Sequence, residues 1–120
     1  MTNRVHIVDA VRTPMGRSKK GRLAHVRPDD MTAVLVRQLL ERNAKVAPER
    51  VDDLIAATAF PEAEQGYNLG RVVAQLAGLP DHVPGMQLNR WCASGLEAVA
   101  TAHAKIATGV ADVIVATGTE

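Results

Sequence analysis

The sequence predicts an α/β domain with a mostly parallel sheet, in which strands and helices follow the order βαβαβαβ. Two observations carry this prediction. Short apolar runs alternate with longer stretches of helical periodicity along the chain. Strands that are joined through helices in this way pair in parallel, through right-handed crossovers. The 120 residues suffice for one domain with a substantial core.

The first element is a strand at residues 4–10, RVHIVDA, whose β-branched residues predict a buried position. A loop follows, because proline and glycine recur through residues 14–28. Asp29 or Asp30 then stands where a helix N-cap is expected. The apolar positions that follow have helical spacing and predict the buried face of the first helix: Met31, Val34, Leu35 and Leu39.

A second strand is predicted around residues 54–58, and the helix that follows it ends at Gly78 and Pro80. A third strand at residues 86–89 leads into an Ala-rich helix that ends at Gly109. The predicted apolar faces of these two helices are Leu69, Val72, Val73 and Leu76 in the second, and Leu96, Val99, His103 and Ile106 in the third.

The last element is a strand at residues 111–118, after which the chain stops at Glu120. Parallel sheets are normally covered by helices on both faces. We therefore expect residues 1–120 to be the front part of a domain that continues.

Composition narrows the function classes. A net charge of +1 and an apolar content of 47% are typical of a globular protein. The single cysteine excludes an internal disulfide and a cysteine-cluster metal site, and we expect no metal. No apolar run is long enough for a signal peptide or a membrane span, so a cytoplasmic setting is expected.

Positive charge is concentrated in the first loop, which has no acid between Thr13 and Val26. The loop carries six cations: Arg12, Arg17, Lys19, Lys20, Arg22 and Arg27. Such a cluster can contact nucleic acid or a phosphate-bearing ligand. No aromatic residue lies among the cations, which argues against single-stranded nucleic acid. A solvated loop is the simpler interpretation, and no nucleic-acid partner is predicted.

The stretch NRWCASGLEAV, residues 89–99, holds the lone cysteine at the predicted junction of the third strand and the third helix. Ligands of open α/β sheets bind outside the carboxyl ends of the strands. A helix N-terminus also favours a thiolate, and Ser94 and Gly95 leave space around it. Position and residue type therefore fit a nucleophile, Cys92, whose backbone N–H helps to bind developing negative charge.

A lone cysteine is more often a small buried hydrophobe, so position alone leaves both interpretations open. A nucleophile also needs a means of activation, usually a base. His103 lies 11 residues beyond Cys92 on the same predicted helix, about 16 Å away, and is expected in the core or at its boundary. The spacing of the remaining histidines recommends none of them: His6, His25 and His82.

Three stretches of the chain resemble the thiolases. NRWCASG resembles the nucleophile segment of this family, IVDAVRTPMGRSKKG resembles its N-terminal strand and loop, and EQGYNLGRVVAQLAGLP resembles its second helix. The likeness is greatest to the 3-ketoacyl-CoA thiolases of fatty acid β-oxidation. It implies a thiolase-like α/β fold, with residues 1–120 as part of the N-terminal domain, before the loop domain and the C-terminal half.

The resemblance implies acyltransferase chemistry. Cys92 would attack a 3-ketoacyl-CoA, release acetyl-CoA and retain an acyl group as a thioester, which a second CoA thiol then takes up; the reverse condensation is also implied. CoA and acyl-CoA would be substrates, with no permanently bound cofactor. Residues 86–90 resemble a strand that pairs across the family's dimer interface, so a homo-oligomer, a dimer or a tetramer, is expected.

The sequence departs from the family in two respects. The family's activating histidine and second cysteine come later in the chain, and a single cysteine excludes that second one here. Thr117, in ATGTE, replaces one of two glycines. We therefore expect residues 1–120 alone to lack full activity. The alternative is a non-catalytic domain that pairs with another chain through an exposed apolar strand at residues 112–116.

Overall fold

The computed structural model describes residues 3–120, so that Met1 and Thr2 of the predicted domain lie outside the described residues. Within residues 3–120, three parallel strands form one sheet in the order β2-β1-β3. The strands are β1 (Asp53–Ala57), β2 (Gly85–Leu88) and β3 (Ile114–Gly118). The helices are α1 (Pro28–Arg42), α2 (Leu69–Leu76) and α3 (Ser94–Ala107), with short 3-10 helices η1 (Pro48–Arg50) and η2 (Ala63–Gln65). The predicted α/β class with a parallel sheet is confirmed.

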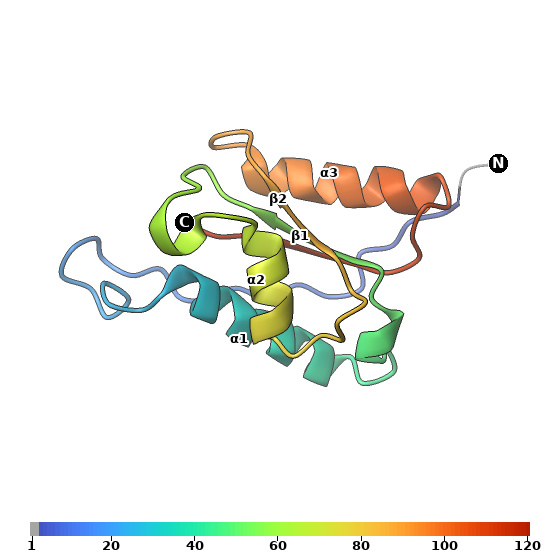
Figure 1. The fold of residues 1–120 in the computed structure, drawn as a ribbon, viewed down its shortest axis with the longest axis horizontal. Coiled ribbons are helices and arrows are strands. Elements are labelled where there is room, and N and C mark those ends of the chain that lie inside the picture. The colour runs from blue at the N-terminus through green and yellow to red at the C-terminus, as the bar shows by residue number, and fades with distance from the viewer. Residues whose placement is uncertain (1–2) are drawn as a thin grey trace.

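Helices cover both faces of the sheet (Figure 1). Helices α1 and α2 pack on one face and α3 packs on the other. All five residues of β1 are buried, because this strand has a neighbour on each side and a helical layer on each face. Its side chains alternate, so that Leu54 and Ala56 join the α1–α2 side while Ile55 and Ala57 join the α3 side.

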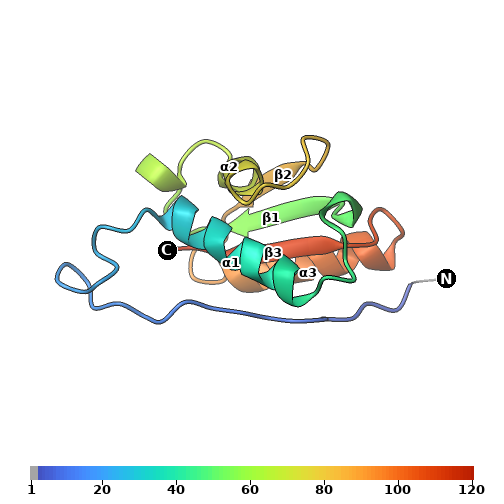
Figure 2. The same ribbon diagram turned by 90° about the horizontal axis from the view of Figure 1, so that it is seen from below.

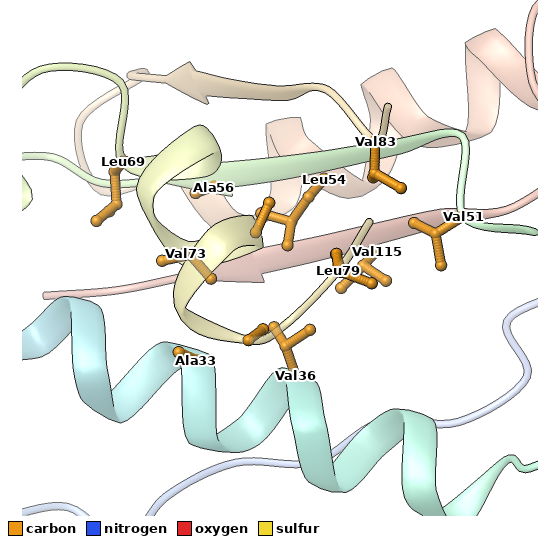
Figure 3. Packing of buried hydrophobic residues seen from close by; sticks show 12 residues of the cluster. Ala33, Val36, Val51, Leu54, Ala56, Leu69, Val73, Leu79, Val83 and Val115 are labelled. Carbon is orange, nitrogen blue, oxygen red and sulfur yellow. The ribbon is translucent and has the colours of Figure 1, made fainter. Parts of the chain in front are cut away.

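The larger part of the core lies between the sheet and the α1–α2 layer, where side chains from all three elements meet (Figure 3). Its members include Val36, Val51, Leu54, Leu69, Val73, Leu79, Val83 and Val115. The part under α3 is smaller and combines Ile55 and Ala57 with two alanines of the helix, Ala98 and Ala102. Aliphatic side chains therefore fill this core, in keeping with the aromatic content of 2%.

The predicted first strand is wrong. Residues 4–10 run beside β3 without strand pairing (Figure 2), and the side chains of Ile7 and Val8 are 80% and 75% exposed. A cavity of about 360 Å³ separates the start of the first loop, residues 11–13, from β3. A strand completes its backbone hydrogen bonds with a strand directly beside it, and residues 4–10 make no such bonds with the outer edge of β3. The order of elements in residues 3–120 is therefore αβαβαβ.

The buried face of α1 also differs from the prediction. The helix begins at Pro28, with Arg27 at the N-cap position, so neither Asp29 nor Asp30 is the cap. The buried residues of the helix are Asp29, Thr32, Ala33 and Val36. Val34 is 43% exposed, while the half-buried Met31, Leu35 and Leu39 line the cavity next to β3. The predicted face is thus the one that borders the cavity.

The predicted face of α3 is wrong at three of its four positions, and only Ile106 is half-buried. Leu96 and Val99 are 75% and 42% exposed, and His103 is exposed instead of lying in the core or at its boundary. Small residues face the sheet in their place: Ser94, Ala98 and Ala102. Small side chains allow the helix to approach the strands closely, and the larger apolar ones then remain outside. The predicted face of α2 is confirmed at Leu69 and Val73, which are buried, whereas Val72 is half-buried and Leu76 is 41% exposed.

Candidate active site

Cys92 lies in the loop between β2 and α3, two residues before the helix begins. Its side chain is exposed and free. The predicted strand–helix junction is therefore confirmed, and the interpretation of Cys92 as a buried hydrophobe is wrong. The carboxyl end of β2 and the start of α3 bring the thiol to the edge of the sheet where the strands of open α/β folds present their ligand sites.

Ser94 holds this loop from inside the fold. It is 2% exposed, and its Oγ accepts a hydrogen bond from the Arg90 N–H (2.7 Å) and donates one to the Trp91 carbonyl oxygen (2.6 Å). The Ser94 N–H also donates to the Trp91 carbonyl oxygen, at 3.0 Å. Gly95, in contrast, has open space where a Cβ would stand. The predicted open space near Cys92 is thus confirmed at Gly95, whereas Ser94 is buried and holds the loop by its hydrogen bonds.

Asn89 braces the loop at its other end. Its Oδ1 accepts a hydrogen bond from the Trp91 N–H (2.8 Å), and its Nδ2 donates to the Ala59 carbonyl oxygen (3.3 Å) in the loop after β1. Trp91 has a φ of 50°, in the left-handed region that bulky residues seldom adopt. Such a conformation persists only where surrounding contacts enforce it. Asn89 and Ser94 supply these contacts on either side of Cys92.

An aromatic pair joins the loops that follow β1 and β2. The rings of Phe60 and Trp91 meet edge to face, with centroids 6.0 Å apart and planes at 81°, a preferred aromatic geometry. Both remain open to solvent, at 58% and 67% exposed. Sequence reasoning missed this pair. The available signal was that the chain has only one Phe, one Trp and one Tyr, and that an aliphatic core leaves them for the surface.

Hydrogen bonds connect the loops that follow the carboxyl ends of the three strands. Beyond β3, the Glu120 Oε1 accepts a hydrogen bond from the Ala59 N–H (2.7 Å), and Ala59 in turn contacts Asn89 through its carbonyl oxygen. At the start of α3, the Arg90 Nε pairs with the Glu97 Oε2 at 3.2 Å. The loops after β1, β2 and β3 are therefore mutually fixed around Cys92.

Neither His103 nor His82 lies where it could act as a base for the Cys92 thiol. His103 is exposed on α3. His82 precedes β2, at the opposite end of the strand from Cys92, with its ring 3.3 Å from the Glu49 carbonyl oxygen. Among residues 3–120, no three side chains of the types that bind metals come together. Over the same residues, no helix combines the length and apolar character that crossing a membrane requires.

The basic loop is exposed and folded into tight turns, such as the hydrogen bond from the Gly21 N–H to the Arg17 carbonyl oxygen (2.8 Å). Arg27 serves the fold, since its Nη2 donates to the Asp29 Oδ2 at 2.7 Å and its Nη1 lies 3.8 Å from the Glu64 Oε1. The hydrogen bond to Asp29 raises the pKa of Arg27. The positive charge of Arg27 is therefore balanced by nearby carboxylates, and Arg27 does not add to a basic surface that is free to bind a ligand.

Comparison with known proteins adds three findings. The family described as thiolase, N-terminal domain, matches residues 5–120. The chain is 49% identical to a 3-ketoacyl-CoA thiolase of Bacillus subtilis over 114 residues, which are 95% of this chain and 29% of that protein. It is 48% identical to a beta-ketoadipyl-CoA thiolase of Pseudomonas knackmussii over 120 residues, all of this chain and 30% of that protein. The chain thus spans less than a third of the length of these relatives.

A solved structure supports the same fold. The crystal structure of the acetyl-CoA acetyltransferase of Bacillus anthracis superimposes with a TM-score of 0.76 at 33% sequence identity. The match covers 82% of this chain and 24% of that one.

Proposed function

The chain belongs to the thiolase family, and on that premise we propose that it forms the acyl-accepting part of a 3-ketoacyl-CoA thiolase, with Cys92 as the nucleophile. The observation that carries the proposal is the exposed thiol at the β2–α3 junction, braced on both sides within the motif NRWCASG. The positive end of the α3 dipole favours a thiolate at this place.

In the thiolytic direction, Cys92 Sγ forms a bond to the 3-keto carbon of a 3-ketoacyl-CoA. The bond between carbons 2 and 3 then breaks, and its electron pair takes up a proton to give acetyl-CoA. The shortened acyl group stays on Cys92 as a thioester until the thiol of a second CoA loses its proton and its sulfur bonds to the acyl carbon, whereupon the bond to Sγ breaks and Cys92 leaves as a thiolate. Condensation follows the same path in reverse. The Cys92 N–H stabilises the negative oxygen of the intermediates.

One cysteine cannot be both the nucleophile and a separate thiol proton donor, so the complete cycle uses groups beyond residues 1–120. For the wider setting we propose what the resemblance to the family implies. CoA and acyl-CoA are the substrates and no cofactor stays bound, the reaction belongs to fatty acid β-oxidation in the cytoplasm, and the enzyme is a dimer or a tetramer. Residues 1–120 are the front part of its N-terminal domain.

Transfer of an acetyl group from acetyl-CoA tests the role of Cys92 without the rest of the enzyme. In this step Cys92 Sγ bonds to the acetyl carbon, and the CoA thiolate leaves and takes up a proton. We expect intact-mass spectrometry to find one acetyl group, mapped to Cys92, formed faster in the native chain than in the same chain in urea. The Cys92→Ser chain should gain none at that position. If the acetylation rate of the native chain is no higher than the rate in urea, the proposal that the fold activates Cys92 is wrong.

Steady CoA-dependent thiolysis of a 3-ketoacyl-CoA provides the second measurement. The 120-residue chain should show none above the Cys92→Ser control, because one thiol does not complete the cycle. Sustained turnover by this chain would contradict the proposal that further groups are needed.

A second candidate function is pairing with another polypeptide. The observation that favours it is the outer edge of β3, which faces a cavity instead of a strand, and unpaired strand edges accept further strands. Dimerisation in sedimentation measurements would support this function if it is kept in Val110→Lys and abolished in Ala116→Lys, with circular dichroism showing that Ala116→Lys is folded, because Ala116 also packs on the α3 side. A monomer that transfers acetyl groups would favour the first.

A further inference from the structure

Most of the cations in the first loop have no carboxylate partner within residues 3–120. The ion pairs of this part of the chain involve Arg27 and three basic residues that follow it, and none involves a cation between residues 12 and 22. We call residues 12–22 the basic arm. Outside the arm, the chain has nine Lys and Arg residues and 13 Asp and Glu residues, so a concentrated positive charge is specific to the arm. Its cations are all exposed: Arg12, Arg17, Lys19, Lys20 and Arg22.

The basic arm is folded into a fixed turn. The Gly21 N–H donates to the Arg17 carbonyl oxygen, and the Lys20 N–H donates to the Ser18 carbonyl oxygen, both at 2.8 Å. A Cβ atom on Gly21 would lie 2.3 Å from the Arg17 carbonyl oxygen, so the turn requires glycine. Lys19 has a φ of 64°, a strained conformation for this residue type. The turn thus holds the cations in place before a partner arrives, which lowers the entropic cost of binding.

An apolar side chain accompanies the cations. Met15 lies between Arg12 and Arg17 in the sequence and is 94% exposed. Cations beside an exposed apolar side chain match the interface of an anionic bilayer, where the cations meet phosphate headgroups and the apolar side chain enters the boundary of the acyl chains. A single-stranded nucleic acid would instead favour aromatic side chains for base stacking, and the arm contains none.

We propose that the basic arm docks the protein reversibly on an anionic lipid surface, with its cations on the headgroups and Met15 at the boundary of the acyl chains. A Lys or Arg near an anionic leaflet raises partition about fivefold, so several cations and one apolar side chain suffice for peripheral binding. Such binding needs no membrane-spanning helix, and none is found among the described residues. The inference does not depend on the chemistry of Cys92.

Docking through the arm would turn the candidate active site towards the lipid surface. A cavity of about 340 Å³ is lined by Arg17 and Lys19 of the arm, by Gln65 of η2, and by Glu120, which follows β3. The arm therefore lies at the carboxyl end of the sheet, where Cys92 follows β2. Figure 1 and Figure 2 both show the arm projecting beyond the helices at this end.

Co-sedimentation with lipid vesicles tests the proposal on the chain as it stands. One set of vesicles consists of phosphatidylcholine, and the other of equal parts of phosphatidylcholine and phosphatidylglycerol, which is anionic. We expect partition onto the anionic vesicles to be higher by about a hundredfold, the gain from three of the five cations at about fivefold each. This difference should shrink as the salt concentration rises.

Charge substitutions locate the effect. Lys19→Gln combined with Lys20→Gln should lower partition onto the anionic vesicles about 25-fold. Arg4→Gln combined with Lys45→Gln is the matched control, because it removes the same charge outside the arm. Lys45 follows the far end of α1, and Arg4 follows Asn3, whose N–H donates to the Ala107 carbonyl oxygen at the end of α3. The control should change partition by about twofold at most.

A substitution of Met15 tests the apolar contact. Met15→Ser should lower partition onto the anionic vesicles about fivefold, less than the gain from full burial, since this side chain enters only the boundary of the acyl chains. Met15→Leu should bind as wild type does. Circular dichroism checks that each variant is folded.

Equal partition onto the two sets of vesicles would overturn the inference, and so would undiminished partition of the folded chain that lacks the charges of Lys19 and Lys20. Unchanged partition of Met15→Ser would contradict the apolar contact. A short DNA duplex serves as the second polyanion. Tighter binding to the duplex than to the anionic vesicles, at equal phosphate concentration, would assign the arm to nucleic acid and also overturn the inference.

Discussion

Gly70 of α2 lies directly against Gly85 of β2, so closely that a Cβ atom on Gly85 would come 2.4 Å from the carbonyl carbon of Gly70. A Cβ atom on Gly70 would meet the Met86 carbonyl oxygen at 2.2 Å. Both neighbours are backbone, so no side-chain rotation relieves the contact. The start of α2 is thereby seated on the strand that leads to Cys92.

Gly70→Ala should destabilise the chain by about 2–3 kcal/mol, because the added methyl group forces α2 away from β2. The midpoint of urea unfolding measures this loss. Gly95→Ala is the matched control, since a Cβ there meets no atom within 4 Å and alanine favours the helix by about 0.5–1 kcal/mol. Equal stability of Gly70→Ala and wild type would show that the two elements separate without cost.

Asp52 gives the fold an acid-sensitive contact between β1 and β3. Its Oδ2 accepts hydrogen bonds from the Val113 N–H (3.0 Å) and the Asp112 N–H (2.7 Å) just before β3. These bonds, with a smaller effect of the Arg50 charge, hold the pKa of Asp52 below its ordinary value of 3.8. The stabilisation is therefore complete above 3.8 and is lost as pH falls through the lowered pKa.

Asp52→Asn should be less stable than wild type at neutral pH, and the difference should close in acid below about pH 3.8. Urea midpoints measured across this range for both chains give the comparison. Asp81→Asn, which changes an exposed carboxylate in the loop before β2, should show no such closing gap. A gap for Asp52→Asn that is constant with pH would mean that the carboxylate charge does not contribute.

The local sequence pattern correctly predicted the strands and helices that find their hydrogen-bonding or packing partners within this chain. The three paired strands fall where short apolar runs stand, and Gly78 follows the end of α2 with a φ of 79°, as a helix-ending glycine requires. Residues 4–10 have an equally apolar sequence but lack a neighbouring strand. A strand depends on that partner, and no feature of the segment itself could reveal its absence.

The helix faces and the site depended on contacts between distant segments. In α3, Ala98 and Ala102 face the sheet, while Leu96 and Val99 remain exposed. Close packing of the helix on the strands therefore outweighs the burial of the larger side chains. The position of Cys92 followed from the order of elements and was predicted. Its surroundings were not, since the pairing of Trp91 with Phe60 joins loops that are 31 residues apart and has no sequence period.

Thr117 stands in β3 where the resemblance predicts glycine, and its Oγ1 is buried without a hydrogen-bond partner. An unpaired buried hydroxyl is unfavourable, so Thr117→Val, which keeps the shape, should raise stability by about 1 kcal/mol. Thr119→Val is the matched control, because the Thr119 Oγ1 contacts the Thr32 Oγ1 at 2.6 Å; it should lower stability by a similar amount. Thermal midpoints of the two variants that shift in the same direction would contradict this assignment.

Ser94 should control the reactivity of Cys92 although it does not touch the reacting atoms. Ser94→Ala removes the two hydrogen bonds that hold Arg90 and Trp91, which should cost about 1–2 kcal/mol and release the loop from its strained conformation. The ratio of the native rate of iodoacetamide labelling to the rate in urea should then fall towards one. Thr108→Ala is the matched control, since its hydroxyl donates to the Ala104 carbonyl oxygen (2.8 Å) at the other end of α3. It should lower stability without changing the labelling ratio. An unchanged ratio in folded Ser94→Ala would mean that the start of α3 activates the thiol without the loop, and that Ser94 stabilises the fold alone.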